Sequence, residues 1–423
     1  MARRVAGQGG TATAAEVSRG RARAFRLPHV RTAAFASLLL ALSGCPSASE
    51  PEPTPTPAPP AVTVAPQPNA TVTAALEALV AEERLPGLAV GVARGDTVVY
   101  LQGFGHEDVA NDVPVDPSAT LFRWASLSKG LAGVVAAQGA AAGTVDLDVS
   151  AEIVDGYTVP GFVLPQGCSN SDCAAPLDAA DRAISLRQLL HHTSGVQHYS
   201  NGATNPVPPS SATGDPATNT GIAWALDYWK DAPLVHVPGS TYDYSTFGYN
   251  LAGVVLETAL DGRFEELVQR SISAPLDITS LQPDFQWVDL PRRAVGYELD
   301  GQAIVVDGDT DVSWKLPGGG FVSTSEDLTR YCSGLLTHAL MDEAIRDDVL
   351  WTPAPGTNYG LGFGVGSFDG EPRIAHTGAQ QKTRTALWWL PERDLCFSVM
   401  TNATWASPSD IAEAAARAWL ESE

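Results

Sequence analysis

The sequence is poor in lysine and cysteine, and it lacks any apolar run long enough to span a bilayer. Of its 26 basic residues only four are lysines: Lys129, Lys230, Lys315 and Lys382. The five cysteines and eight histidines show no metal-ligand spacing, and no H-E-x-x-H motif, Walker loop or G-x-S-x-G elbow occurs. These absences argue against a zinc peptidase, a P-loop nucleotide hydrolase and an α/β-hydrolase. We expect neither a metal nor a cofactor.

The charge balance is strongly acidic. The 423 residues carry a formal net charge of −22 at pH 7, and the pI is near 4.6. A surface this negative repels nucleic acid and anionic lipid head groups, so we expect no nucleic-acid partner. High solubility is the simpler consequence of the same charge.

Residues 1–45 are predicted to be an export signal. An arginine-rich stretch precedes an apolar run from Thr32 to Gly44, which has the length of a signal-peptide core. The run ends at Leu42-Ser43-Gly44-Cys45, which is similar to a bacterial lipobox, in which the cysteine is acylated. We therefore expect Cys45 to carry a lipid that anchors the protein to a membrane of the bacterial cell envelope. An ordinary signal peptide with a coincidental cysteine is the alternative.

Residues 46–69 are predicted to be a disordered tether, because this stretch is dense in proline and poor in large apolar residues. Two of the remaining cysteines, Cys168 and Cys173, could close a small disulfide in an oxidising envelope. Cys332 and Cys396 lie among apolar residues and are predicted to be single core cysteines.

The sequence near each end of the folded part predicts a β-hairpin. Apolar residues at helical spacing over 71–84 are followed by alternating residues from Leu88 to Tyr100 around a turn. Near the C-terminus, the strand-like residues 385–390 and 395–400 flank a second turn, and 411–420 follows as a helix. Hairpins at both ends predict one antiparallel sheet that is assembled from both termini and flanked by helices.

The middle of the chain is predicted to be mainly helical, from about residue 130 to 290. Its candidate helices are 127–142, 185–192 and 248–260. The predicted fold class is therefore α/β (α+β). A single domain over residues 70–423 would contain the antiparallel sheet and an inserted helical part.

The scarcity of lysine makes Lys129 notable, because it lies three residues after Ser126. Arginine is always protonated, whereas a buried lysine can be shifted to act as a base. Positions i and i+3 share a helix face, so the amine can reach the hydroxyl. A serine hydroxyl is a weak nucleophile until an adjacent base takes its proton. The spacing predicts Ser126 as nucleophile and Lys129 as proton acceptor, with a solvated surface lysine as the alternative.

Two distant segments support this prediction, Tyr244-Ser245-Thr246 and His376-Thr377-Gly378. Ser-x-x-Lys, Tyr-x-Asn and Lys-Thr-Gly, in this order, are the motif set of penicillin-recognising serine hydrolases. The chain departs from the set twice, with Thr246 where asparagine is usual and His376 where lysine is usual. The alternatives are a core aromatic for Tyr244 and a structural histidine for His376.

Several blocks between residues 75 and 420 resemble the class C β-lactamase-like serine hydrolase family. They are ASLSKG, LRQLLHHTSGVQHY, YSTFGYNLAG, WKLPGGGFVSTSEDL and HTG. The resemblance implies a β-lactamase/transpeptidase-like fold in which Ser126 is acylated and Lys129 and Tyr244 share proton transfer. It also implies that the backbone N–H groups of Ser126 and Ala379 hold the oxyanion. The substrate-binding residues that it implies are Thr246, His376, Thr377, Gly378 and Ala379.

The two departures bear on the substrate. The lysine that family members place at position 376 helps to hold the carboxylate of β-lactams and D-alanyl peptides. Histidine is mostly neutral at pH 7, and threonine has a shorter reach than asparagine. Both changes favour an esterase or peptidase that forms an acyl-enzyme on a less anionic small-molecule or peptide substrate. The alternatives are a D-alanyl-D-alanine carboxypeptidase or weak β-lactamase, and a non-catalytic envelope protein that keeps the fold.

Other features are predicted to be structural. Gly318–Gly320 is expected to turn the chain into a helix, for which Ser323 and Glu326 have capping-box spacing. His191 and His192 are expected to pack at a helix end.

Overall fold

The computed structural model describes residues 62–148, 184–199, 222–229 and 234–423. The predicted signal segment with Cys45, and the cysteines Cys168 and Cys173, lie outside the described residues.

Within the described residues, the main sheet has eight strands in the order β1-β3-β2-β13-β12-β11-β10, with β4 paired to β3. Their bounds are β1 (Thr63–Val64), β2 (Gly87–Arg94), β3 (Thr97–Asp108), β4 (Val113–Pro114), β10 (Gly364–Phe368), β11 (Glu371–Gln380), β12 (Thr383–Leu390) and β13 (Leu395–Thr401). The remaining described strands are β5 (Phe122–Arg123), β9 (Phe321–Ser323) and β6 (Gln282–Pro283), which form a small second sheet, and the hairpin of β7 (Tyr297–Asp300) and β8 (Ala303–Val306).

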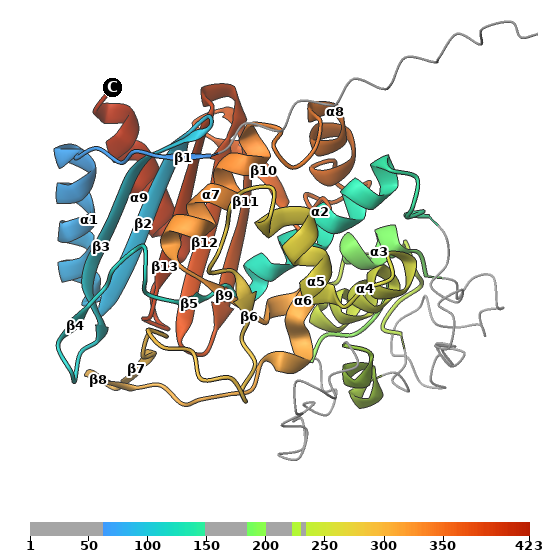
Figure 1. The fold of residues 1–423 in the computed structure, drawn as a ribbon, viewed down its shortest axis with the longest axis horizontal. Coiled ribbons are helices and arrows are strands. Elements are labelled where there is room, and N and C mark those ends of the chain that lie inside the picture. Colours follow the sequence, from blue (N-terminus) through green and yellow to red (C-terminus); the bar gives the residue numbers. More distant parts are fainter. Residues whose placement is uncertain (1–61, 149–183, 200–221, 230–233) are drawn as a thin grey trace, which may run out of the picture. The chain divides into compact units, whose positions relative to one another are not determined.

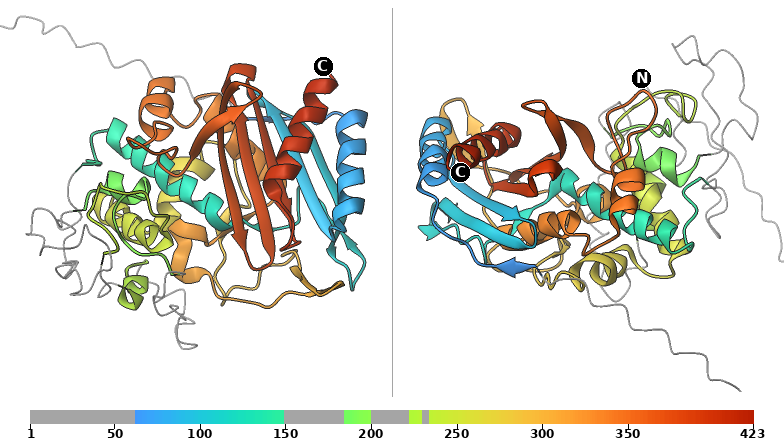
Figure 2. Two further views of the ribbon diagram at one scale, coloured as in Figure 1. Left: turned by 180° about the vertical axis from the view of Figure 1, so that it is seen from behind. Right: turned by 90° about the horizontal axis from the view of Figure 1, so that it is seen from above.

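The two ends of the chain meet in the middle of the main sheet, as the sequence predicted. β2 pairs antiparallel with β13, with Val92 opposite Phe397. Helices α1 (Ala70–Glu83) and α9 (Pro408–Glu421) cover one face of the sheet, and α7 (Ser325–Leu336) packs against the other (Figures 1 and 2). Both faces are therefore buried, with Val90 and Val92 toward α1 and α9, and Ala89 on the opposite side.

Ordered structure begins before the predicted boundary at residue 70. Val62 is 4% exposed, and β1 pairs in parallel with β3 through Thr63 opposite Thr97. The backbone N–H of Gln67 donates to Val99. Residues 62–69 thus belong to the folded part rather than to a disordered tether, because their backbone groups complete the sheet edge.

The helical region lies beside the sheet (Figure 1). Its elements are α2 (Ser128–Ala141), α3 (Leu186–Leu190), η5 (Ala223–Tyr228), α4 (Thr246–Ala259), α5 (Phe264–Val268), η6 (Gln269–Ser273), η7 (Ser313–Lys315) and α6 (Leu316–Gly319). The short helices η1 (Ala125–Leu127), α8 (Glu343–Ile345), η8 (Arg346–Leu350) and η9 (Pro391–Arg393) complete the described elements. α2 is rich in glycine, alanine and valine, and most of its residues are buried.

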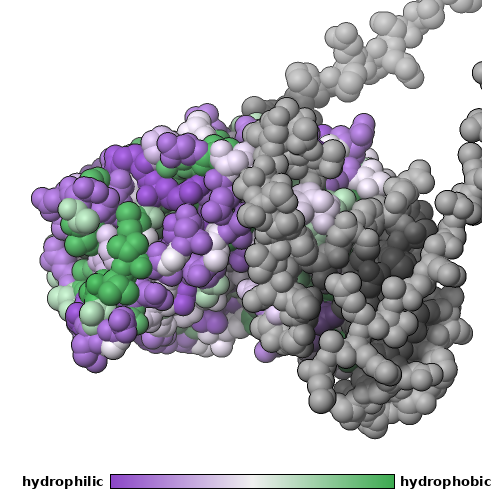
Figure 3. Space-filling model, turned by 90° about the horizontal axis from the view of Figure 1, so that it is seen from below, coloured by the Kyte–Doolittle hydropathy of each residue, from purple (hydrophilic) through white to green (hydrophobic). Residues whose placement is uncertain are grey.

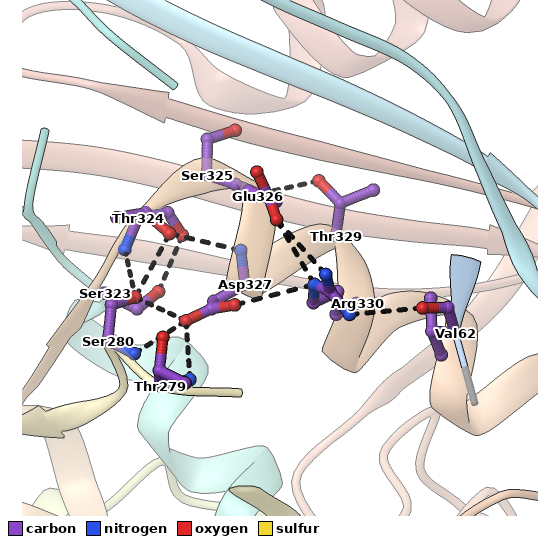
Figure 4. Close-up of polar contacts among 10 residues, drawn as sticks. All are labelled: Val62, Thr279, Ser280, Ser323, Thr324, Ser325, Glu326, Asp327, Thr329 and Arg330. Atoms are coloured by element: carbon purple, nitrogen blue, oxygen red, sulfur yellow. Dashed lines mark hydrogen bonds and ion pairs between the residues drawn. The ribbon is translucent and has the colours of Figure 1, made fainter. Parts of the chain in front are cut away.

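The start of α7 differs from the predicted capping box by one residue. Thr324, rather than Ser323, is the N-cap, and its side chain accepts from the backbone N–H of Asp327. The buried carboxylate of Asp327 accepts from the backbone N–H groups of Thr279 and Ser280 at 3.0 and 2.7 Å (Figure 4). A carboxylate at the third helical position suits this role, because it also faces the positive end of the helix dipole.

The structure differs from the sequence prediction at two cysteines. The structure joins Cys332 of α7 to Cys396 of β13 in a disulfide, where single core cysteines were predicted; their Cα atoms are 6.1 Å apart. No helix among the described residues is both long and apolar enough to cross a bilayer. Where Figure 3 colours the surface by hydropathy, hydrophilic residues surround a small apolar patch. Leu299 and Val306 of the β7–β8 hairpin are among the exposed apolar side chains.

Candidate active site

Ser126 and Lys129 lie at the junction of η1 and α2. Lys129 Nζ is 3.3 Å from Ser126 Oγ. The same amine lies 3.2 Å from Thr246 Oγ1 and 2.6 Å from the carbonyl oxygen of Gly318. Ser126 is half-buried, whereas Lys129 is fully buried. The predicted nucleophile and proton acceptor are thus within hydrogen-bond reach of each other.

The turn that carries Ser126 is strained and firmly held. Ala125 has a φ of 48°, in the left-handed region that residues with a side chain seldom occupy. Such strain persists only where surrounding contacts fix the backbone. Here Thr385 of β12 donates its hydroxyl to the carbonyl of Trp124 at 2.9 Å. The sheet therefore holds the nucleophile in place.

Lys129 has an unusual electrostatic setting. Within the described part of the chain it makes no ion pair, and its three polar contacts are two hydroxyls and a carbonyl. Burial, reinforced by the charge of Lys315, holds the pKa of Lys129 well below its usual range. A neutral amine can donate to the Gly318 carbonyl and to Thr246 and still present its lone pair to Ser126.

Tyr244 lies close to the same amine, with Lys129 Nζ 4.8 Å from its ring centroid. Burial raises the pKa of Tyr244, and a hydrogen bond with Ser126 offsets only part of this rise. The phenol therefore keeps its proton, which suits a donor better than a base. Thr246, predicted to bind substrate, is 3% exposed and contacts Lys129, so the geometry makes it a partner of the base.

Two histidines that sequence reasoning did not assign to the site hold the Tyr244–Thr246 segment. The backbone N–H of Ser245 donates to His192 Nδ1 at 3.0 Å, and that of Thr246 donates to His198 Nδ1 at 3.2 Å. The rings of His192 and Tyr244 have centroids 4.3 Å apart. Burial lowers the pKa of both histidines, that of His198 to about 4, so at neutral pH the Nδ1 atom of each ring is free to accept. His192 thus positions the tyrosine and does more than pack at a helix end.

β11 carries the His376-Thr377-Gly378 motif to the turn before Ser126. A Cβ atom on Gly378 would overlap the carbonyl oxygen of Trp124, so only glycine allows this close approach. In the described residues, β10 pairs with β11 only as far as Ala375. Thr377 and Ala379 are exposed beyond that point, whereas Gly378 is buried.

His376 is held as a neutral side chain. Its Nδ1 lies 2.7 Å from the carbonyl oxygen of Thr377 and must therefore donate, which leaves Nε2 to accept from the Tyr359 hydroxyl at 2.7 Å. Burial, with the Lys129 charge, lowers the pKa of His376 to about 3. A cavity of about 300 Å³ is lined by Tyr244, Tyr359, His376 and Thr377, among others.

Sequence reasoning missed His192, His198, Tyr359 and the Gly318 carbonyl. His192 and His198 lie in the LRQLLHHTSGVQHY block, which contributed only to the family resemblance. Gly318–Gly320 was predicted only to turn the chain. Tyr359 lies in an irregular segment and gave no local signal. Among the described residues, no group of three or more histidine, cysteine or acidic side chains could hold a metal ion.

Comparison with known proteins identifies the family of the chain. The profile of the Beta-lactamase family matches residues 72–419. The chain is 24% identical over 404 residues to the human mitochondrial serine beta-lactamase-like protein LACTB, and the match covers 75% of this chain and 71% of that protein.

Two solved structures share the fold. The octameric penicillin-binding protein homologue from Pyrococcus abyssi has a TM-score of 0.65 and 22% identity, covering 83% of this chain and 77% of its own. The D-amino acid amidase from Ochrobactrum anthropi, solved with L-phenylalanine, has a TM-score of 0.65 and 20% identity, covering 83% and 98%.

Proposed function

Because the chain belongs to the β-lactamase family of serine hydrolases, we propose that it cleaves ester or amide bonds through an acyl-enzyme on Ser126. The observation that carries this proposal is the buried Lys129 amine, 3.3 Å from Ser126 Oγ and with a lowered pKa. A base poised in this way can remove the serine proton as the hydroxyl attacks.

Formation of the acyl-enzyme then needs three proton transfers. Ser126 Oγ bonds to the substrate carbonyl carbon and gives its proton to Lys129. When the bond to the leaving group breaks, the departing oxygen or nitrogen takes a proton from Tyr244, whose raised pKa keeps it protonated. Lys129 restores the proton to Tyr244. In the second half, water gives a proton to Lys129 as its oxygen bonds to the acyl carbon. The bond from that carbon to Ser126 Oγ then breaks, Ser126 Oγ takes up the proton, and the acid product leaves.

The developing oxyanion would accept from the backbone N–H groups of Ser126 and Ala379. Two features support this assignment. Gly378 packs directly against the carbonyl of Trp124, which brings the end of β11 to the nucleophile turn. That turn is fixed by Thr385, so its N–H group is preorganised, which is what makes such donors effective.

The part of the substrate that contacts His376 would be uncharged. A neutral imidazole already bonded to Tyr359 and to a carbonyl offers little to a carboxylate. We therefore propose an esterase or amidase acting on small acyl compounds or peptides rather than a dedicated β-lactamase.

The test uses purified protein, a fluorescent fluorophosphonate and a fluorescent penicillin, with Ser126→Ala as the matched control. Labelling by the phosphonate that disappears in the control supports the proposal, and added labelling by penicillin would favour the carboxypeptidase or β-lactamase alternative. Labelling of neither kind would contradict the enzyme proposal and favour a binding role. A panel of esters, amides and β-lactams then ranks the substrates by kcat/KM.

A further inference from the structure

A second lysine, Lys315, lies near the candidate site. It ends η7, immediately before α6, whose Gly318 carbonyl contacts Lys129. The Lys315 side chain is 9% exposed, and its ammonium lies 5.7 Å from the ring centroid of Tyr199 and 5.5 Å from that of Trp314. Within the described residues it makes no hydrogen bond and no ion pair through its side chain.

Two other cations of the described chain, one buried and one half-buried, have carboxylate partners. Arg123, which is 4% exposed, pairs with Asp284 at 2.5 Å. Lys382 pairs with Asp309 at 2.9 Å. A largely buried charge without a counterion is costly, so an anion that arrives from outside the fold would stabilise it.

Lys315 is also near enough to act on the site. Its charge contributes to the lowered pKa of both Lys129 and His198. Burial, with the charge of Arg123, lowers its own pKa to about 8, so it remains mostly protonated at pH 7. His376, by contrast, is neutral at that pH. Lys315 is therefore a protonated ammonium near the site that has no hydrogen bond or ion pair within the described residues, and it does not occupy the position of the usual Lys-Thr-Gly lysine.

We propose that Lys315 binds a carboxylate of the substrate, so that the enzyme prefers esters or amides that carry one negative charge. The inference rests on the proposed acyl-enzyme function, and it replaces the expectation of a weakly anionic substrate with a carboxylate bound away from His376. The two aromatic rings around the ammonium would exclude water and strengthen the ion pair.

The test compares matched pairs of esters. In the first pair the charge is on the acyl side, with p-nitrophenyl hydrogen glutarate against p-nitrophenyl valerate. In the second it is on the leaving group, with 3-carboxyphenyl butyrate against phenyl butyrate. The measured quantity is the ratio of kcat/KM for the charged ester to that for the neutral ester. Because the quantity is a ratio within one variant, it does not depend on how much total activity each variant keeps.

In Lys315→Met this ratio should fall about tenfold for at least one pair, as expected for the loss of one partly buried ion pair. Lys315→Arg keeps the charge and should keep most of the preference. Lys382→Met is the matched control, because it removes a lysine that already has a carboxylate partner. The pair that responds identifies whether the carboxylate belongs to the acyl or the leaving group.

Two failures can be told apart. If the wild type hydrolyses the esters through Ser126 but Lys315→Met leaves both ratios unchanged, the carboxylate site is wrong and the proposed function stands. If the wild type hydrolyses none of the esters and is not labelled by the fluorophosphonate, or if Ser126→Ala hydrolyses the esters equally well, the proposed function fails and this inference fails with it.

Discussion

Replacing Lys129 with methionine should change how the stability of the protein depends on pH. In an unfolded chain a lysine has a pKa of about 10.4, whereas burial holds the pKa of Lys129 in the folded protein well below its usual range. Between these two values the unfolded chain binds a proton that the folded protein does not. Lys129 therefore destabilises the fold in that window, and this cost disappears as the pH rises toward the unfolded pKa.

The magnitude follows from the linkage. Each pH unit within the window changes the free energy of unfolding by up to about 1.4 kcal/mol. If the amine stays neutral in the fold, the free energy of unfolding of the wild type should rise by about 3 kcal/mol relative to that of the methionine variant between pH 7 and pH 9.5. Methionine also leaves the Gly318 carbonyl without its donor, which costs about 1–3 kcal/mol. That cost does not depend on pH, so only the slope of the difference is diagnostic.

The assay is urea unfolding of both proteins at several pH values, followed through tryptophan fluorescence. Ser126→Ala is the control, because it alters the same contact but keeps the amine, and it should follow the wild-type slope. If the free energies of unfolding of the wild type and Lys129→Met change in parallel with pH, Lys129 is protonated in the fold. The amine could not then accept the Ser126 proton, and the reasoning for the mechanism would be refuted.

Three further predictions follow from the same geometry, and a fourth follows from the sequence. Ser126→Ala should abolish phosphonate labelling and hydrolysis. Lys129→Arg should lose nearly as much kcat/KM because a guanidinium cannot deprotonate, and the double variant should be hardly worse than either single variant. Hydrolysis by a folded Ser126→Ala variant would contradict this prediction. His192→Asn, whose amide oxygen can still accept from Ser245, should keep more kcat than His192→Leu, whereas equal losses would argue against positioning. His376→Lys should tighten binding of carboxylate-bearing β-lactams by about 1 kcal/mol, or several-fold, with little effect on neutral esters, and equal effects on both would remove His376 from a carboxylate-facing role. Cys45→Ala should release the protein from membranes and abolish labelling by a palmitate analogue; absence of label in the wild type would refute the anchor.

The sheet was predictable from the sequence because its strands carry local patterns. Alternation at Leu88–Tyr100 and strand-like residues at 385–400 identified both hairpins, and the structure pairs them through β2 and β13. β1 was missed because two residues that follow a proline-rich stretch carry no periodicity. Their pairing depends on the edge of β3, which is a tertiary feature.

Site residues divide in the same way. Ser126 and Lys129 are close in sequence, so helix geometry alone brings them together. His192 and His198 act through ring nitrogens that face backbone N–H groups some fifty residues away, a contact that no local spacing can encode. The scarcity of lysine was a usable signal for Lys315, but its burial beside Tyr199 became visible only in the fold.

Carboxylate binding by Lys315 has a consequence for the base. The charge of Lys315 contributes to the lowered pKa of Lys129, so a bound carboxylate would reduce this contribution. Burial is the larger of the two causes, however, and it does not change when substrate binds. Burial in turn depends on the packing of α2 against α4 and α6, because Thr246 and the Gly318 carbonyl both contact the amine. The same packing that stabilises the core therefore keeps the amine able to accept a proton.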